Sequence, residues 1–243
     1  MKSLKKFLLT TAMTMIVGTS AFAASGFEFI LNVPLGVGIG IPTKSMKESE
    51  MKSRAGFDGG VTAQLGYMFQ VVDGFGISVL GELGYAFSSY VVEMKSKVDI
   101  SIAQDGSQMV DMATTPYFNF HSFQIGLLPK FNIGAFAIGI GGGVKIPVAG
   151  EQVSKGKYAG ESYNNKVKWK SADIKDFINP AVIGYIKGTF DYSIFFTDNL
   201  AFNIGLYLAG DIATQKASAG EKKENMSTFD VGVELGLKFG PKA

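Results

Sequence analysis

The chain has 243 residues, of which 47% are hydrophobic and only 18% are charged, with 31 glycines, 20 phenylalanines, one histidine and no cysteine. Soluble domains usually carry charge on about a quarter of their residues, so this composition is unusually apolar. The apolar content excludes a long disordered protein. The missing cysteines exclude a disulfide scaffold and, with a single histidine, a four-ligand Cys/His zinc site. We expect neither a metal nor another cofactor.

Residues 1–23 have the three parts of a secretory signal peptide. A basic start is followed by an apolar run from Phe7 to Val17 and by Ala21-Phe22-Ala23, a small-residue cleavage site. That run is too short to cross a membrane of about 30 Å as a helix. Cleavage removes three lysines and leaves 20 basic against 21 acidic side chains, so no nucleic-acid partner is predicted. Residues 24–243 are expected to form one domain.

The rest of the chain alternates between apolar and polar residues with the period of a β-strand. From Phe27 to Ile41, for example, every odd position is apolar. A change of phase between Phe120 and Phe123 predicts a β-bulge. Eight such runs predict eight strands, at residues 27–41, 57–69, 75–91, 117–131, 135–146, 181–196, 200–212 and 229–239.

The connections between these runs alternate between short and long. Three are tight and hold turn residues, at 71–74, 132–134 and 197–199. Four are long and polar, at roughly 42–56, 92–116, 147–180 and 213–228. The pattern predicts an all-β fold: an eight-stranded antiparallel transmembrane β-barrel with three short periplasmic turns and four long extracellular loops.

All charged side chains within the eight runs lie on the polar face of their strand. A Lys or Arg that faces lipid at mid-bilayer costs about 2–4 kcal/mol, which explains the bias. The alternative, a soluble β-sandwich, is disfavoured because the polar faces are rich in Gly and Ala rather than in Lys, Glu and Thr. The inward charges are Glu28, Asp58, Glu82, Lys130, Lys145, Lys187, Asp191, Asp211, Asp230, Glu234 and Lys238.

An eight-stranded barrel is only wide enough inside for side chains, so we expect these charges to form ion pairs that plug the lumen. Glu28 on the first strand and Lys238 on the last lie at similar heights, which predicts a pair across the closing seam. A mid-to-upper network is expected from Glu82, Lys145, Lys187, Asp211 and Asp230, and Asp191 and Glu234 complete the lumen set. The alternative is a wetter lumen with solvated charges.

The signal peptide, the eight strands and the asymmetric connections resemble the small outer-membrane barrels of the OmpA, OmpX and OmpW kind. The resemblance implies a bacterial outer-membrane location, contact with membrane lipid and recognition of the last strand by the barrel assembly machinery. That strand ends on Phe239, but Gly240-Pro241-Lys242-Ala243 follows it, which departs from the family pattern. No residues remain for the periplasmic wall-binding domain of two-domain members, so wall anchoring is not expected.

The sequence favours neither nucleotide binding nor lipid-modifying catalysis. Glycines at 36–40 and 139–143 are not phosphate loops, because the strand pattern continues through them; they leave room for Lys and Tyr from opposite strands. Some eight-stranded barrels are lipid A acylases or deacylases, and His121 with Ser122, near the acidic loop holding Asp105 and Asp111, is the candidate here. Neighbouring strand residues point to opposite faces, so we expect no catalytic site unless the bulge reorients them.

The third long loop carries the binding candidates Lys155, Lys157, Lys166, Lys168, Trp169 and Lys170. Val167 and Trp169 alternate with the lysines, so strands are expected to continue above the membrane. The lysines suit anionic lipopolysaccharide-type head groups or a host anionic polymer. The alternative is a solvated hairpin whose Trp169 belongs to the interfacial aromatic girdle. The predicted role is surface structure or adhesion through the loops; the alternative is a conduit or binding site for a small hydrophobic ligand, as in the OmpW-like branch.

Overall fold

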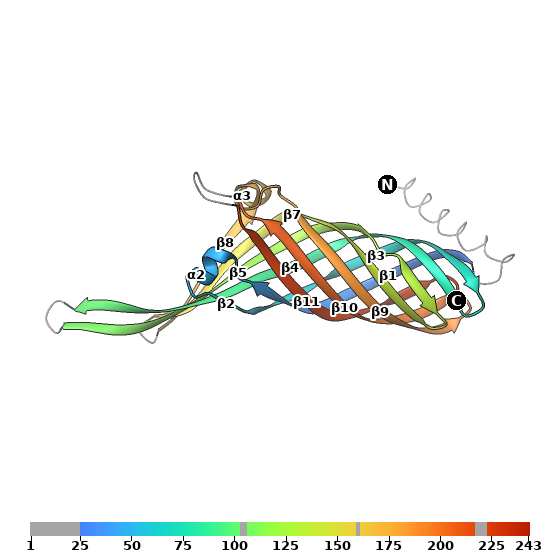
Figure 1. Ribbon diagram of the computed structural model, residues 1–243, viewed down its shortest axis with the longest axis horizontal. Coiled ribbons are helices and arrows are strands. Elements are labelled where there is room, and N and C mark those ends of the chain that lie inside the picture. The colour runs from blue at the N-terminus through green and yellow to red at the C-terminus, as the bar shows by residue number, and fades with distance from the viewer. Residues whose placement is uncertain (1–24, 103–105, 159–160, 217–222) are drawn as a thin grey trace, which may run out of the picture.

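A computed structural model describes residues 25–102, 106–158, 161–216 and 223–243. The predicted signal peptide at 1–23 lies outside the described residues. The chain forms one antiparallel sheet rolled into a long cylinder (Figure 1). Its strands are β1 (Gly26–Ile41), β2 (Lys52–Ser53), β3 (Ala55–Val72), β4 (Phe75–Ile102), β5 (Gly106–Leu127), β6 (Lys130–Ile133), β7 (Phe136–Tyr158), β8 (Glu161–Lys170), β9 (Ile183–Thr197), β10 (Leu200–Thr214) and β11 (Asn225–Phe239).

The sheet closes on itself through backbone hydrogen bonds. The ring runs β1–β3–β4–β5–β7–β9–β10–β11, and β11 pairs with β1. β6 continues β5 after an interruption at 128–129 and pairs with β4 and β7. β5 and β6 therefore occupy one position in the ring together. Closure leaves no free sheet edge within the ring.

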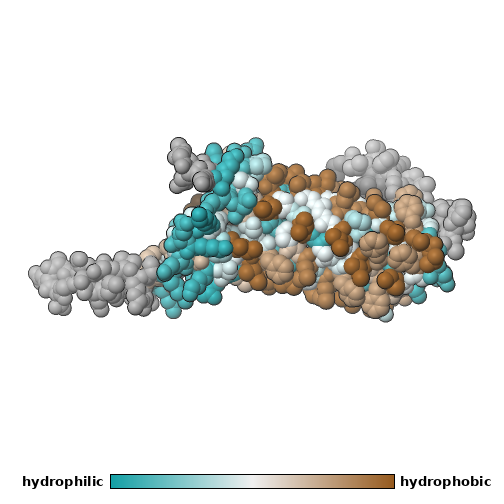
Figure 2. Space-filling model, in the orientation of Figure 1, coloured by the Kyte–Doolittle hydropathy of each residue, from teal (hydrophilic) through white to brown (hydrophobic). Residues whose placement is uncertain are grey.

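The two-residue alternation sorts side chains between the outside and the lumen. Along β1 the odd positions from Phe27 to Ile41 are exposed except for the half-buried Phe29, whereas Glu28, Ile30 and Asn32 are buried. The same split recurs around the ring, and the exposed apolar residues form the brown band of Figure 2. All the charged side chains that the sequence placed on the polar faces point into the lumen, where their exposure is about a tenth or less. That prediction is confirmed.

The three tight turns lie at one end of the barrel, together with the start of β1 and the end of β11 (Figure 1). Gly74 and Gly134 take φ values of +75° and +58°, in the left-handed region that favours glycine, and so allow two of these turns. Within the described segments, no helix has the length and the apolar character needed to cross a membrane.

The opposite end is built differently from the expectation of long loops. β4 and β5 remain paired up to Ile102 and Gly106, and β7 and β8 form a second extended hairpin. The predicted loops at 92–116 and 147–180 are therefore mainly strand, because a two-stranded ladder satisfies its own backbone hydrogen bonds outside the membrane as well as within it. Two short helices complete this end, α2 (Lys44–Glu48) and α3 (Ser171–Phe177). The predicted bulge is confirmed as a register shift between His121 and Ser122.

Candidate functional site

The lower lumen holds two buried ion pairs. Lys238 Nζ lies 2.6 Å from a carboxylate oxygen of Glu28, which is the pair expected across the seam between β11 and β1. Ser78 donates a hydrogen bond to the other oxygen of Glu28. Lys130 Nζ lies 2.8 Å from Asp191, and both of these side chains are 1% exposed. Each lysine thus neutralises one acid in a space closed to water.

The middle of the lumen is crossed by a group of three charges. Lys187 Nζ on β9 lies 2.7 Å from Glu82 on β4 and 3.0 Å from Glu234 on β11. Gln64 and Tyr185 donate hydrogen bonds to Glu82 at 2.9 and 3.0 Å. Because the three charges come from strands at different positions around the ring, the lysine joins separate walls of the barrel.

The upper lumen has more acid than base. Lys145 Nζ lies 2.5 Å from Asp211, its only ion-pair partner among the described residues. Asp58 and Asp230 lie close to one another over Gly38, since a Cβ added to that glycine would come within 2.4 and 2.8 Å of their oxygens. Three carboxylates therefore share one lysine at this level.

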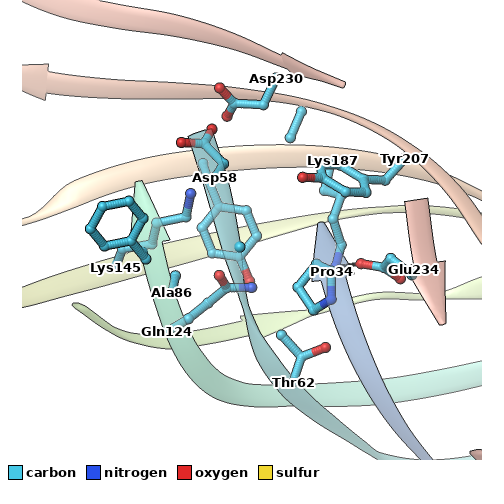
Figure 3. A pocket seen from close by; sticks show the side chains of 14 residues that line it. Pro34, Asp58, Thr62, Ala86, Gln124, Lys145, Lys187, Tyr207, Asp230 and Glu234 are labelled. Atoms are coloured by element: carbon cyan, nitrogen blue, oxygen red, sulfur yellow. Dashed lines mark hydrogen bonds and ion pairs between the residues drawn. The ribbon is translucent and has the colours of Figure 1, made fainter. Parts of the chain in front are cut away.

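The expected network of Glu82, Lys145, Lys187, Asp211 and Asp230 is divided into two groups. No ion pair between described residues joins the Lys187 group to the Lys145 group. Between them lies a cavity of about 50 Å³, large enough for a few water molecules. Figure 3 shows Lys187 near Glu234 on one side of this cavity and Lys145 near Asp58 on the other. The lumen therefore combines the predicted ion pairs with a cavity lined partly by charged side chains.

An apolar cluster covers the mouth of the barrel at the end opposite the tight turns, and sequence reasoning missed it. It is formed by Tyr90, Val92, Phe118, Phe120, Ile174, Ile178, Ile183, Ala213 and Met226, with Met46, Met51, Trp169 and Phe177 packed against it. The helix α3 contributes Ile174 and Phe177, whose spacing of three residues places them on one helix face. In the sequence, this three-residue spacing within 171–178 was the signal that could have predicted an apolar helix face at the barrel mouth. The cluster sits over the charged lumen like a cap.

Trp169 belongs to this cap and not to a lipid-facing girdle. Its ring centroid lies 5.0 Å from that of Phe177, 5.9 Å from that of Phe118 and 6.2 Å from that of Phe120. Successive side chains of a strand point to opposite faces, so Trp169 points towards the mouth and its neighbours Lys168 and Lys170 point away from it. These lysines, like Lys155, Lys157 and Lys166, are exposed.

Two inward glycines make room for tyrosines, as the sequence predicts, but each tyrosine comes from two strands away around the ring and not from an opposite strand. A Cβ added at Gly36 would lie 2.2 Å from Tyr207 Oη, and one at Gly126 would lie 2.1 Å from Tyr185 Oη. These contacts are too short for any Cβ atom. The glycine-rich segments thus belong to the packing of a narrow lumen.

His121 and Ser122 do not form a catalytic pair in the structure. His121 Nδ1 lies 2.6 Å from Tyr85 Oη on the outer surface, whereas Ser122 is fully buried on the lumen side. Asp105 lies outside the described residues, and only the backbone of Asp111 is described. Among described side chains, no three His, Cys, Asp or Glu residues lie close enough together to hold a metal ion.

The closed ring, the apolar outer face and the charged interior together decide the type of protein. Only helices and closed barrels can satisfy all backbone hydrogen bonds within lipid. An outward apolar band around a polar interior is the arrangement of outer-membrane barrels. The chain has the architecture of a small transmembrane β-barrel.

Comparison with known proteins gives matches at the level of fold. No protein-family model matches the sequence, and no curated protein does. Among solved structures, Ail, the attachment invasion locus protein of Yersinia pestis, is 11% identical, with 90% of this chain and 100% of that chain covered and a TM-score of 0.31. OprG, an outer membrane protein of Pseudomonas aeruginosa, is 16% identical (90% and 98% covered, TM-score 0.33), and the outer membrane protease OmpT of Escherichia coli is 10% identical (92% and 99% covered, TM-score 0.33).

The seam pair provides a first test of the lumen. Replacing Lys238 with Met leaves the fully buried Glu28 carboxylate without its cation. The free energy of unfolding is expected to fall by about 1.5–3 kcal/mol, measured by urea unfolding of the barrel in lipid vesicles. Lys242→Met, at an exposed position beyond the last strand, is the matched control and should change nothing measurable. Equal effects of the two substitutions would contradict a stabilising seam pair.

Proposed function

We propose that the chain is an integral outer-membrane protein in which eight strands cross the membrane around a lumen closed to solutes. The crossing strands are β1, β3, β4, β5 with β6, β7, β9, β10 and β11, in the order of the hydrogen-bonded ring. The tight turns then face the periplasm and the extended hairpins face outward. Phe239, exposed on the outside at the end of β11, is available to membrane lipid and to the assembly machinery.

The observation that carries the closed lumen is the set of buried ion pairs in its lower and middle parts. Lys130, Lys187 and Lys238 are all nine-tenths or more buried, and each contacts an acid inside the lumen. The apolar cap then covers the mouth above them. A solute that crosses the lumen would have to break these ion pairs, and little water is available there to solvate the separated charges.

Because the lumen is closed, we propose that the extracellular hairpins carry the function, which is surface structure or adhesion. Hairpins on a rigid barrel offer a stable surface for binding. We propose that the protein is not an enzyme, because His121 and Ser122 point to opposite sides of the wall. An assay of lipid A acylation and deacylation tests this part: activity in the native protein that His121→Ala abolishes would contradict it.

Electrical recording in planar bilayers tests the closed lumen. Folded protein, checked by its heat-modifiable gel mobility, is expected to give no discrete channel openings. Steady unitary openings from protein that passes the folding check would contradict the proposal.

A second candidate function rests on an apolar cavity below the cap. The cavity has a volume of about 30 Å³ and is lined mainly by Tyr90, Phe120, Ile183, Ala213 and Met226, with Asp211 at its edge. At this size the cavity holds a group of only a few atoms, so a small hydrophobic or amphiphilic ligand would bind here only after the cap opens. Recording conductance with and without amphiphiles separates the two candidates, since an amphiphile-dependent conductance favours the conduit and continued silence favours the closed barrel.

A further inference from the structure

The β7–β8 hairpin has two chemically different faces. Residues directly opposite in an antiparallel pair point to the same side of the sheet. In the observed register Ala149 lies opposite Lys170, Glu151 opposite Lys168 and Val153 opposite Lys166, and further along Lys155 lies opposite Asn164 and Lys157 opposite Ser162. One face therefore gathers Lys155, Lys157, Lys166, Lys168 and Lys170, which we call the lysine face. The other face carries Trp169 and packs against the cap.

The lysine face continues the lipid-facing surface of the barrel. β7 pairs with β5 so that Ala149 lies opposite His121 and Val153 opposite Tyr117. Further down the same alternating positions of β5 carry Phe123 and Ile125, which are exposed in the apolar band. The lysines thus extend upward from a wall that lipid covers, on the side away from the barrel mouth.

The lysines begin at the edge of the apolar band and rise well above it. Val148 is the last exposed apolar residue of the band on β7, Lys170 lies opposite the next residue, and Lys157 comes nine residues after Val148. With a rise of about 3.4 Å per residue on a strand tilted by about 40°, the set extends to about 20 Å above the band. Phospholipid head groups occupy only about 5–8 Å on each side of the hydrocarbon. A taller anionic head group matches the height of the lysine face better.

The charge on this face is mostly uncompensated. Glu151 is its one acidic residue, and its carboxylate lies 2.5 Å from Lys166 Nζ. A hydrogen bond from Lys166 holds the pKa of Glu151 below its usual range, so the acid stays ionised in that pair. Among described side chains, no carboxylate forms an ion pair with the other four lysines, and Lys155 lies 5.0 Å from the centre of the Tyr117 ring. The hydrophilic collar above the band is visible in Figure 2.

We propose that the lysine face binds the phosphate groups of a phosphorylated glycolipid in the outer leaflet of the membrane. The inference rests on the proposed orientation, in which the extended hairpins face outward. A membrane lipid is favoured over a soluble polymer because the lysines start at the lipid edge and follow the lipid-covered wall. Sugars with attached phosphates give anionic groups at several heights, as the rising lysines require. The bound lipid would hold the base of the hairpin upright on the membrane.

Binding of a bis-phosphorylated glycolipid to the folded protein in neutral detergent micelles tests the proposal. The same glycolipid after removal of its phosphates serves as the ligand control. We expect the phosphorylated form to bind at least about tenfold more tightly, and this advantage to shrink as salt is raised. Changing all five residues of the lysine face to Gln should remove the advantage, and Lys168→Gln with Lys170→Gln, at the lipid edge, should reduce it even if the larger variant fails to fold.

A matched variant controls for total charge. Changing Lys44, Lys47, Lys52, Lys175 and Lys223 to Gln removes the same number of exposed lysines elsewhere on the extracellular end and should leave the tenfold advantage intact. Equal binding of the two glycolipid forms, or equal loss in both variants, overturns the proposal. Binding of a soluble sulfated polysaccharide without binding of the glycolipid also overturns it. Heat-modifiable mobility is scored in parallel, so that a failure of lipid binding is distinguished from a failure of the barrel itself.

Discussion

Replacing Lys187 with Met is expected to lower the free energy of unfolding by about 3–5 kcal/mol. The substitution removes the only cation that contacts Glu82 and Glu234 among the described residues, and both acids are 1% exposed. Two buried carboxylates would then repel each other without compensation, whereas the loss of the lysine side chain itself is offset by the similar volume of Met. Urea unfolding in lipid vesicles, followed by heat-modifiable mobility, measures the change.

A combined variant separates charge from packing. Adding Glu82→Gln and Glu234→Gln to Lys187→Met removes all three charges and keeps the shapes of the side chains, so most of the lost stability should return. Gln64 and Tyr185 retain a polar partner at position 82 in this variant. If the triple variant is as unstable as the single one, the ion pairs are not what stabilises the middle of the lumen.

Replacing Ile174 with Ala is expected to release α3 from the barrel mouth. The side chain of Ile174 is fully buried in the apolar cap, and deletion of a buried Ile side chain to Ala costs about 2–5 kcal/mol. The helix has only seven residues and cannot stay folded without that contact. Because Trp169 packs on Phe177 in the same cap, its fluorescence should shift to longer wavelength as water reaches it.

The readout is specific because Trp169 is the only tryptophan of the chain. Lys175→Ala changes the neighbouring, exposed position of α3 and should leave the emission unchanged. The urea midpoint of the whole barrel should move little in either variant, since the cap opens locally while the ring of strands persists. An unchanged Trp169 emission in Ile174→Ala would show that the cap does not depend on α3.

The sequence alone determined which side of the wall each strand residue faces. Alternation is a local property with a period of two residues, so charged residues such as Glu28, Glu82 and Lys238 could be placed inside before any fold was known. The bulge near His121 followed from a break in the same period. Similar distance from the strand ends at the side of the tight turns was enough to pair Glu28 with Lys238, because the first and last strands must meet when a barrel closes.

The tertiary structure decided which inward groups touch and what covers the mouth. Lys187 forms ion pairs with Glu82 and Glu234, and it does not belong to the same network as Lys145. Which charges meet depends on the position of each strand around the ring and on the stagger between strands, and the alternation of residues encodes neither. The capping role of α3 depended on Phe118 and Phe120, which lie about fifty residues earlier in the chain. The lysine face likewise required the register of β7 with β8, since a shift of one residue would have divided the same lysines between the two sides.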